Sequence, residues 1–190
     1  MSPDDNIFFR YKPILGNKLG EGGYEDIFEG ICLENGLKVA VKFATKMDNM
    51  VYMTIPGHPK PIPSEVALHI LANKGPSVGQ IIQLLDWQEE AEYYIMVTEC
   101  PSPYETMFDF LKCQGGNLNE GLAWHMMWQA TLAAEMCCLR GVLHRNLKLE
   151  NLLVSSDTPD VKLINSGCGD LLKDSAYKTF YGTDVPPKVY

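Results

Sequence analysis

Two closely spaced prolines divide this chain into halves whose hydrophobic patterns predict different secondary structure. Before Pro101 and Pro103, short apolar stretches alternate with glycine-containing turns, a pattern typical of β-strands. After them, residues 119–140 form one long segment that is apolar on nearly every side. A helix of that kind has to be buried over most of its surface. The sequence therefore predicts an α+β chain with a β-rich first half and a helical second half.

Composition and charge exclude several classes of function. The 190 residues are 46% apolar and 21% charged, as in a globular protein, and the net charge is −8. An acidic surface argues against nucleic acid and anionic lipid as partners. No signal peptide or membrane span is recognisable, and the six cysteines are scattered. We therefore expect reduced thiols, a cytoplasmic or nuclear location, and no membrane association. The oligomeric state is not indicated.

The alternation of apolar and polar residues places the individual elements. In the first half, strands are predicted at residues 11–15, 27–31, 37–43, 81–87 and 93–98, with a helix at 65–73 after Ser64. Residues 54–63 hold four prolines and are predicted to form a loop. In the second half, helices are predicted at 107–113 and 119–140, followed by short apolar runs at 142–143, 152–154 and 161–164.

A glycine-rich turn in the first half could bind a phosphate. Gly20, Gly22 and Gly23 lie between two predicted strands, where the lack of a Cβ lets backbone N–H groups approach an anion. A plain hairpin would explain the same glycines. The phosphate interpretation gains support from Lys42, which could reach phosphates, and from Glu65, which could hold that lysine as an ion pair.

Two stretches in the second half resemble motifs of protein kinases. Residues 142–151, VLHRNLKLEN, resemble the catalytic loop, and residues 161–167, VKLINSG, stand where those enzymes carry Asp-Phe-Gly. Order and spacing match over residues 15–187. The sequence is most similar to the PIM family of serine/threonine kinases. The segments that carry this resemblance are 83–87, 99–103, 108–110, 141–144 and 171–174.

The resemblance implies a two-lobed kinase fold, with an N-lobe at 1–100 and a C-lobe at 101–190. It implies ATP and Mg²⁺ as cofactors and a protein as substrate or partner. Lys148 would be the catalytic-loop lysine, and Asn151 and Asn165 would be the metal positions. The cofactor contacts would be Glu99 in the hinge and the apolar Leu19, Ile27, Ala40 and Leu153. Pro101 in the hinge lacks the N–H that usually bonds adenine.

Two substitutions remove carboxylates that this chemistry uses. Asn146 replaces the aspartate that accepts the hydroxyl proton, and an amide has no useful basicity. Asn165 replaces the metal-binding aspartate, although Mg²⁺ favours charged oxygen ligands. The positions of the catalytic base and of the main metal ligand therefore both carry an amide in place of a carboxylate.

Other departures concern packing and the glycine-rich turn. Ser166 and His69 replace apolar side chains and are expected to fill their positions poorly. Glu25 stands where a third glycine is usual and Asp26 follows, so two carboxylates would repel a triphosphate unless they point outward. Residues 182–188 resemble a shortened activation-segment end, and the family's later C-lobe helices are expected to be absent.

Three functions remain open on these residues. The loss of both carboxylates favours a pseudokinase that acts by binding partners. The retained Lys42, Glu65, Lys148 and Asn151 favour a kinase with residual ATP-dependent activity. The missing helices favour an incomplete, non-functional product.

Overall fold

The computed structural model describes residues 6–175 and residue 177, which form two compact units. The first unit contains the residues up to 66 together with 82–103, and the second contains 67–81 together with the residues from 104 onward. The chain as a whole is α+β, as expected for a kinase-like fold. The segment 182–188, with its resemblance to an activation-segment end, lies outside the described residues.

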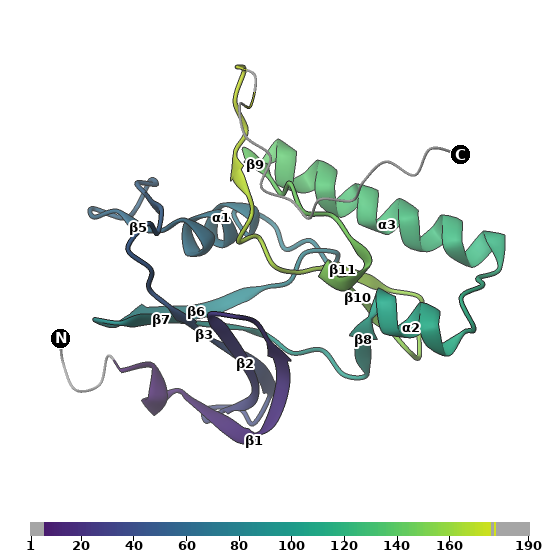
Figure 1. Ribbon diagram of the computed structural model, residues 1–190, viewed down its shortest axis with the longest axis horizontal. Helices are drawn as coiled ribbons and strands as arrows, with labels where there is room; N and C mark the ends of the chain where they lie inside the picture. Colours follow the sequence, from purple (N-terminus) through teal and green to yellow (C-terminus); the bar gives the residue numbers. More distant parts are fainter. Residues whose placement is uncertain (1–5, 176, 178–190) are drawn as a thin grey trace. The chain divides into compact units, whose positions relative to one another are not determined.

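The first unit is built on a five-stranded antiparallel sheet with the strand order β1-β2-β3-β7-β6 (Figure 1). A short 3-10 helix precedes the sheet, and the elements are η2 (Ile7–Phe9), β1 (Tyr11–Glu21), β2 (Glu25–Cys32), β3 (Lys38–Thr45), β6 (Leu84–Glu89) and β7 (Tyr93–Glu99). The predicted strands are confirmed, but β1 extends through Gly20 and leaves only residues 22–24 as the turn.

Alternation along the strands places the core of this unit on one face of the sheet. Six buried side chains form it, namely Ile7, Cys32, Val39, Val41, Ile95 and Val97. Full burial of a side chain of this size contributes about 1.5–3 kcal/mol. Residues between them in sequence, such as Lys42 between Val41 and Phe43, project from the other face.

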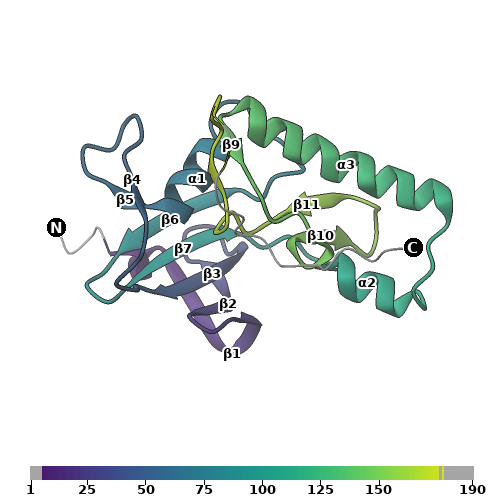
Figure 2. The same ribbon diagram turned by 45° about the horizontal axis from the view of Figure 1, so that its top comes forward.

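The proline-rich loop contains more structure than its sequence predicts. Its ends pair as the two-residue strands β4 (Tyr52–Met53) and β5 (Ile62–Pro63), at the base of an extended loop that is visible in Figure 2. The helix α1 (Ser64–Ala72) follows directly and confirms the predicted helix. The strand predicted at 81–87 begins only at Leu84, and Ile81 instead forms an isolated parallel bridge with Leu163 within the second unit.

The second unit combines most of α1 and two further helices with short strands. Its elements are β8 (Tyr104–Thr106), α2 (Met107–Cys113), α3 (Glu120–Leu139), β9 (Val142–Leu143), η3 (Leu149–Asn151), β10 (Leu152–Ser155), β11 (Val161–Leu163) and β12 (Asp170–Leu171). The strands form one sheet in the order β11-β10-β8 and a second pair, β12-β9. The predicted helices and apolar runs are therefore confirmed, and Figure 1 shows α3 as the long green helix.

The helix α3 buries only part of its surface. Met126, Ala130, Ala133 and Cys137 recur every three or four residues and are buried. The prediction that α3 is buried on most sides is wrong, because another face of the helix is exposed. Four large side chains on it are 50–73% exposed, namely Trp124, Met127, Trp128 and Leu139. Among the helices within residues 6–175, none is both long and apolar enough to cross a bilayer.

Gly30 in β2 provides a test of how tightly the sheet packs. A Cβ at this position would lie 2.8 Å from Cγ2 of Val41 and 3.1 Å from the backbone oxygen of Lys12. We expect Gly30→Ala to lower the free energy of unfolding by about 1–3 kcal/mol, measured by urea denaturation. Gly23→Ala is the matched control, because a Cβ there meets nothing within 4 Å. Equal losses in both variants would contradict this packing argument.

Candidate functional site

In the first unit, the ammonium group of Lys42 on β3 lies between two carboxylates. Its Nζ is 2.6 Å from Oε1 of Glu65 on α1 and 2.9 Å from Oε1 of Glu25 on β2. The Lys42 side chain is only 12% exposed. Burial acts to lower the pKa of Lys42, but the carboxylates of Glu65 and Glu25 together raise that pKa above its ordinary value. The lysine is therefore charged and fully engaged with acidic side chains of its own unit.

The strand register explains why Glu25 reaches this lysine. Ile27 pairs with Lys42 and Glu25 pairs with Ala44, so the Glu25 and Lys42 side chains are diagonal neighbours on one face. Asp26 lies between Glu25 and Ile27 on β2, so its side chain projects from the opposite face of the sheet. Both acidic residues are expected to repel a triphosphate unless they point outward. Asp26 points away from Lys42, whereas Glu25 contacts it.

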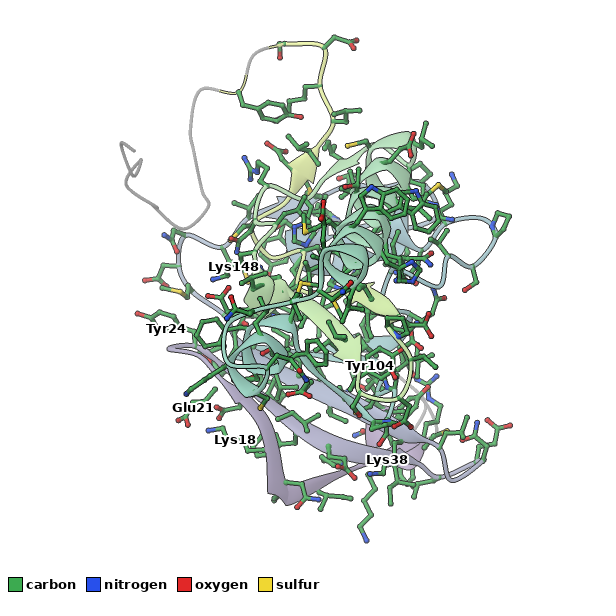
Figure 3. The ribbon with its side chains drawn as sticks, turned by 90° about the vertical axis from the view of Figure 1, so that its right-hand side faces the viewer. Lys18, Glu21, Tyr24, Lys38, Tyr104 and Lys148 are labelled. Carbon is green, nitrogen blue, oxygen red and sulfur yellow. The ribbon has the colours of Figure 1, made fainter. Side chains whose placement is uncertain are left out.

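The β1–β2 turn has its own ion pairs on the outward side. Nζ of Lys18 lies 2.9 Å from Asp26 and 3.1 Å from Glu21. Figure 3 shows Lys18, Glu21 and Tyr24 at this end of the hairpin. The N–H of Gly22 donates to the backbone oxygen of Glu25 at 2.8 Å and closes the turn. The predicted glycine-rich turn is thus short, acidic and internally paired.

Tyr94 on β7 belongs to the same network and was missed by the sequence analysis. Its hydroxyl donates to Oε2 of Glu65 at 2.7 Å. Burial, and then the Glu65 carboxylate, raise the pKa of Tyr94, so the phenol stays protonated. Its pairing with Ala44 puts it on the same face as Lys42, so the β3–β7 register was the signal that could have identified it.

The other predicted cofactor residues of this unit are placed on the sheet. Leu19 and Gly20 lie on β1, Ile27 on β2, Ala40 on β3 and Glu99 at the end of β7. A Cβ on Gly20 would meet Ile27 at 3.5 Å. The carboxylate of Glu99 accepts a hydrogen bond from the backbone N–H of Gln83 at 2.9 Å, so it secures the junction between β6 and β7.

In the second unit, hydrogen bonds donated by asparagine side chains connect three of the predicted site residues. Nδ2 of Asn151 donates to the backbone oxygen of Asn146 at 2.7 Å, and Nδ2 of Asn165 donates to Oδ1 of Asn151 at 3.5 Å. The side chain of Asn146 donates to Sγ of Cys168 at 3.6 Å. Asn151 is buried, and Lys148 stands just before η3. Leu153, on β10, also belongs to this unit.

These amides do not fit a magnesium ion. All three side chains are neutral, and Mg²⁺ favours charged oxygen ligands. Oδ1 of Asn151 already accepts from Asn165, and Oδ1 of Asn165 accepts from the N–H of Gly167 at 3.3 Å. Among the described residues, no group of three or more His, Cys, Asp or Glu could hold a metal. The metal expected from the resemblance therefore lacks a suitable donor set.

Arg145 fixes the loop that carries Asn146. Its guanidinium donates to the backbone oxygens of Cys168 at 2.7 Å and Gly169 at 2.8 Å, and it lies 3.5 Å from Asp170. The backbone of Arg145 has φ 60°, and that of Asn165 has φ 62°. Asn and Asp tolerate this left-handed conformation better than most residues. An aspartate could therefore replace Asn165 without added backbone strain.

His69 and Ser166 form a buried polar pair inside the second unit. Oγ of Ser166 lies 2.5 Å from Nδ1 of His69, and both residues are 5% exposed. The sequence predicts that these side chains fill apolar positions poorly. In the folded chain they form a hydrogen bond in place of an apolar contact, because the hydroxyl and the imidazole lie within bonding distance.

His144 is the other buried histidine of the unit. Nε2 lies 3.1 Å from the backbone oxygen of Ile164, whereas Nδ1 has no hydrogen-bond partner among the described residues. Burial lowers the pKa of His144 more than its hydrogen bonds to the backbone of Ile164 and Asn165 raise it. The imidazole of His144 is therefore neutral in the folded chain at pH 7.

Comparison with known proteins identifies the family of the chain. The protein kinase domain family matches residues 14–186. The chain is 36% identical to the serine/threonine-protein kinase pim-2 of Danio rerio over 95% of its length. It is 33% identical to the serine/threonine-protein kinase prk-2 of Caenorhabditis elegans over 92% of its length, and 31% identical to PLK4 of Nematostella vectensis over 87%. It spans 60%, 38% and 16% of these three proteins, respectively.

Loss of the buried polar pair should destabilise the chain. Ser166→Ala removes the hydroxyl that bonds His69, and we expect the free energy of unfolding to fall by about 1–3 kcal/mol. Ser156→Ala, at an exposed position of the same unit, should change it by less than about 0.5 kcal/mol. Urea denaturation measures both. A Ser166→Ala chain as stable as the Ser156→Ala chain would contradict the importance of the pair.

His144 should make stability depend on pH. Its folded pKa lies below the ordinary 6.5, so below that pH the unfolded chain binds more protons, and unfolding is favoured. We expect the free energy of unfolding to decrease from about pH 7 to pH 5, with a smaller decrease in His144→Gln. His125→Gln, on α3, is the control and should keep the wild-type slope. Identical slopes in wild type and His144→Gln would refute the assignment.

Proposed function

This chain belongs to the protein kinase family and is homologous to the PIM-type serine/threonine kinases, and from this premise we propose that it is a pseudokinase. In this proposal it has lost most or all phosphoryl transfer to protein serine and threonine, and it acts by binding a protein partner. Its location in the cytoplasm or nucleus remains a prediction.

The neutral amides of Asn146, Asn151 and Asn165 carry this proposal. A neutral amide at position 146 can orient a hydroxyl group but cannot accept its proton. General-base catalysis typically contributes about 10²–10⁴ to a rate. The amides at 151 and 165 hydrogen-bond one another at 3.5 Å and supply no charge to balance Mg²⁺, which in kinases neutralises the charge on the transferred phosphate.

A second candidate function is residual ATP-dependent kinase activity. The observation in its favour is the ion pair between Lys42 and Glu65, at 2.6 Å, which active kinases need in order to hold the nucleotide phosphates. In this case ATP and Mg²⁺ would still be used and the partner would be a protein substrate. The additional carboxylate of Glu25 on Lys42 weighs against it.

Restoring the two carboxylates tests the proposal. We expect the unmodified chain to transfer no more γ-phosphate from millimolar ATP and Mg²⁺ to a mixture of Ser/Thr peptides than Lys42→Met does. Asn146→Asp combined with Asn165→Asp should raise transfer by about 10² or more above that background, since both the base and the metal ligand return. A radiolabelled phosphate assay measures this.

Controls separate chemistry from folding in this experiment. Asn73→Asp combined with Asn119→Asp adds the same charge elsewhere and should leave transfer at background. The urea midpoint of each variant shows whether it is folded. Transfer by the unmodified chain above that of Lys42→Met would overturn the pseudokinase proposal and favour residual kinase activity.

A further inference from the structure

We propose that Glu25 serves as an internal substitute for a phosphate group on Lys42, so that the first unit selects a neutral nucleoside over a nucleotide. This inference deepens the proposed function and rests on it, because it names the class of ligand that a non-catalytic member of the family would take. Its observations all lie within the first unit.

The geometry puts the Glu25 carboxylate where an anionic ligand of Lys42 would have to bind. A lysine at this place on the third strand binds nucleotide phosphates in kinases and is oriented by the helix glutamate. Here Glu65 takes the orienting role at 2.6 Å, and Glu25 contacts the same Nζ at 2.9 Å from the turn side of the sheet. The second anion that Lys42 is suited to bind is thus already supplied by the chain.

The charge of this group opposes a further anion. Lys42 contributes one positive charge, while Glu25 and Glu65 contribute two negative charges, so the contacting groups sum to minus one. Glu65 also accepts from the Tyr94 hydroxyl and is buried, which makes it a fixed part of the network. A triphosphate would have to displace Glu25, whose side chain is 37% exposed, or approach it against like-charge repulsion.

The apolar side chains beside Lys42 are only partly buried and can contact an uncharged ligand. Ala40 lies two residues before Lys42 on β3, and Ile27 is its cross-strand partner, so both share its face of the sheet. Planar heterocycles bind mainly through apolar contacts of this kind. A nucleoside such as adenosine keeps these contacts and brings no phosphate to the acidic group.

Asp26 provides a matched control because it has the same charge next to Glu25 in the turn. Its carboxylate pairs with Lys18 at 2.9 Å on the opposite face. Removing its charge changes the net charge and the charge density of the turn as removing that of Glu25 does. Only the Glu25 variant frees Lys42, so a difference between the two variants isolates the contact itself.

The test is a calorimetric measurement of ATP and adenosine binding to the full chain without added metal. We expect the unmodified chain to bind adenosine at least as tightly as ATP. Glu25→Gln should tighten ATP binding by about ten- to hundredfold, as expected for loss of a like-charge contact, and change adenosine binding by less than about threefold. Asp26→Asn should change either affinity by less than about threefold, since its charge lies on the other face.

Two further variants keep the result interpretable. Glu25→Gly should tighten ATP binding in the same direction, which guards against an effect peculiar to glutamine. Adding Lys42→Met to Glu25→Gln should abolish the gain, because the freed ammonium group is its source. Urea midpoints show that each variant is folded.

The proposal is overturned if Glu25→Gln leaves ATP affinity unchanged, if Asp26→Asn gives an equal gain, or if no folded variant binds ATP. Its failure is separable from failure of the pseudokinase proposal. Phosphate transfer by the unmodified chain would overturn the latter, whereas the ratio of ATP to adenosine affinity tests Glu25 alone. Glu25→Gln retains Asn146 and Asn165, so it should bind ATP more tightly without transferring its phosphate.

Discussion

The ammonium group of Lys42 is the charge around which the first unit is organised. A buried cation is tolerated only when paired, because desolvation otherwise costs several kcal/mol. Glu65 at the start of α1 and Glu25 at the start of β2 supply two carboxylates, and Tyr94 satisfies the second oxygen of Glu65. Three strands and a helix are therefore connected by one network of side chains. The same pairing that stabilises this arrangement is the basis of the proposed preference for an uncharged ligand.

The second unit shows a comparable replacement of functional groups by structural ones. Where kinases carry carboxylates that act on a proton and a metal, this chain has the amides of Asn146 and Asn165, which donate to Sγ of Cys168 and to Oδ1 of Asn151. Where they carry an apolar contact, it has the buried pair of His69 and Ser166. Amides and hydroxyls can donate and accept at once, so these substitutions close internal hydrogen bonds. In the folded chain these polar groups therefore stabilise loops and buried contacts.

Much of the fold could be predicted from local patterns, and the exceptions have identifiable causes. The alternation in residues 37–43 predicted β3, and the long apolar run at 119–140 predicted α3. The exposed face of α3 was not predicted, since apolar composition indicates a need for burial but not which neighbours provide it. The strand β1 extended into the glycine-rich turn because its pairing with β2 continues to Glu21 and Asp26. Pairing between strands can override the preference of single glycines.

At the site, the order of amino acids is enough to establish which chemical groups are present. It established that Asn146 and Asn165 stand in place of carboxylates, that Lys42 and Glu65 are retained, and that Glu25 and Asp26 add two acids to the turn. The direction in which those acids point depends on how the strands pair in the folded chain. The β2–β3 register turns Glu25 toward Lys42 and Asp26 toward Lys18. Side chains alternate across a strand, so a shift of one residue in register would exchange the two roles, and composition carries no information about that register.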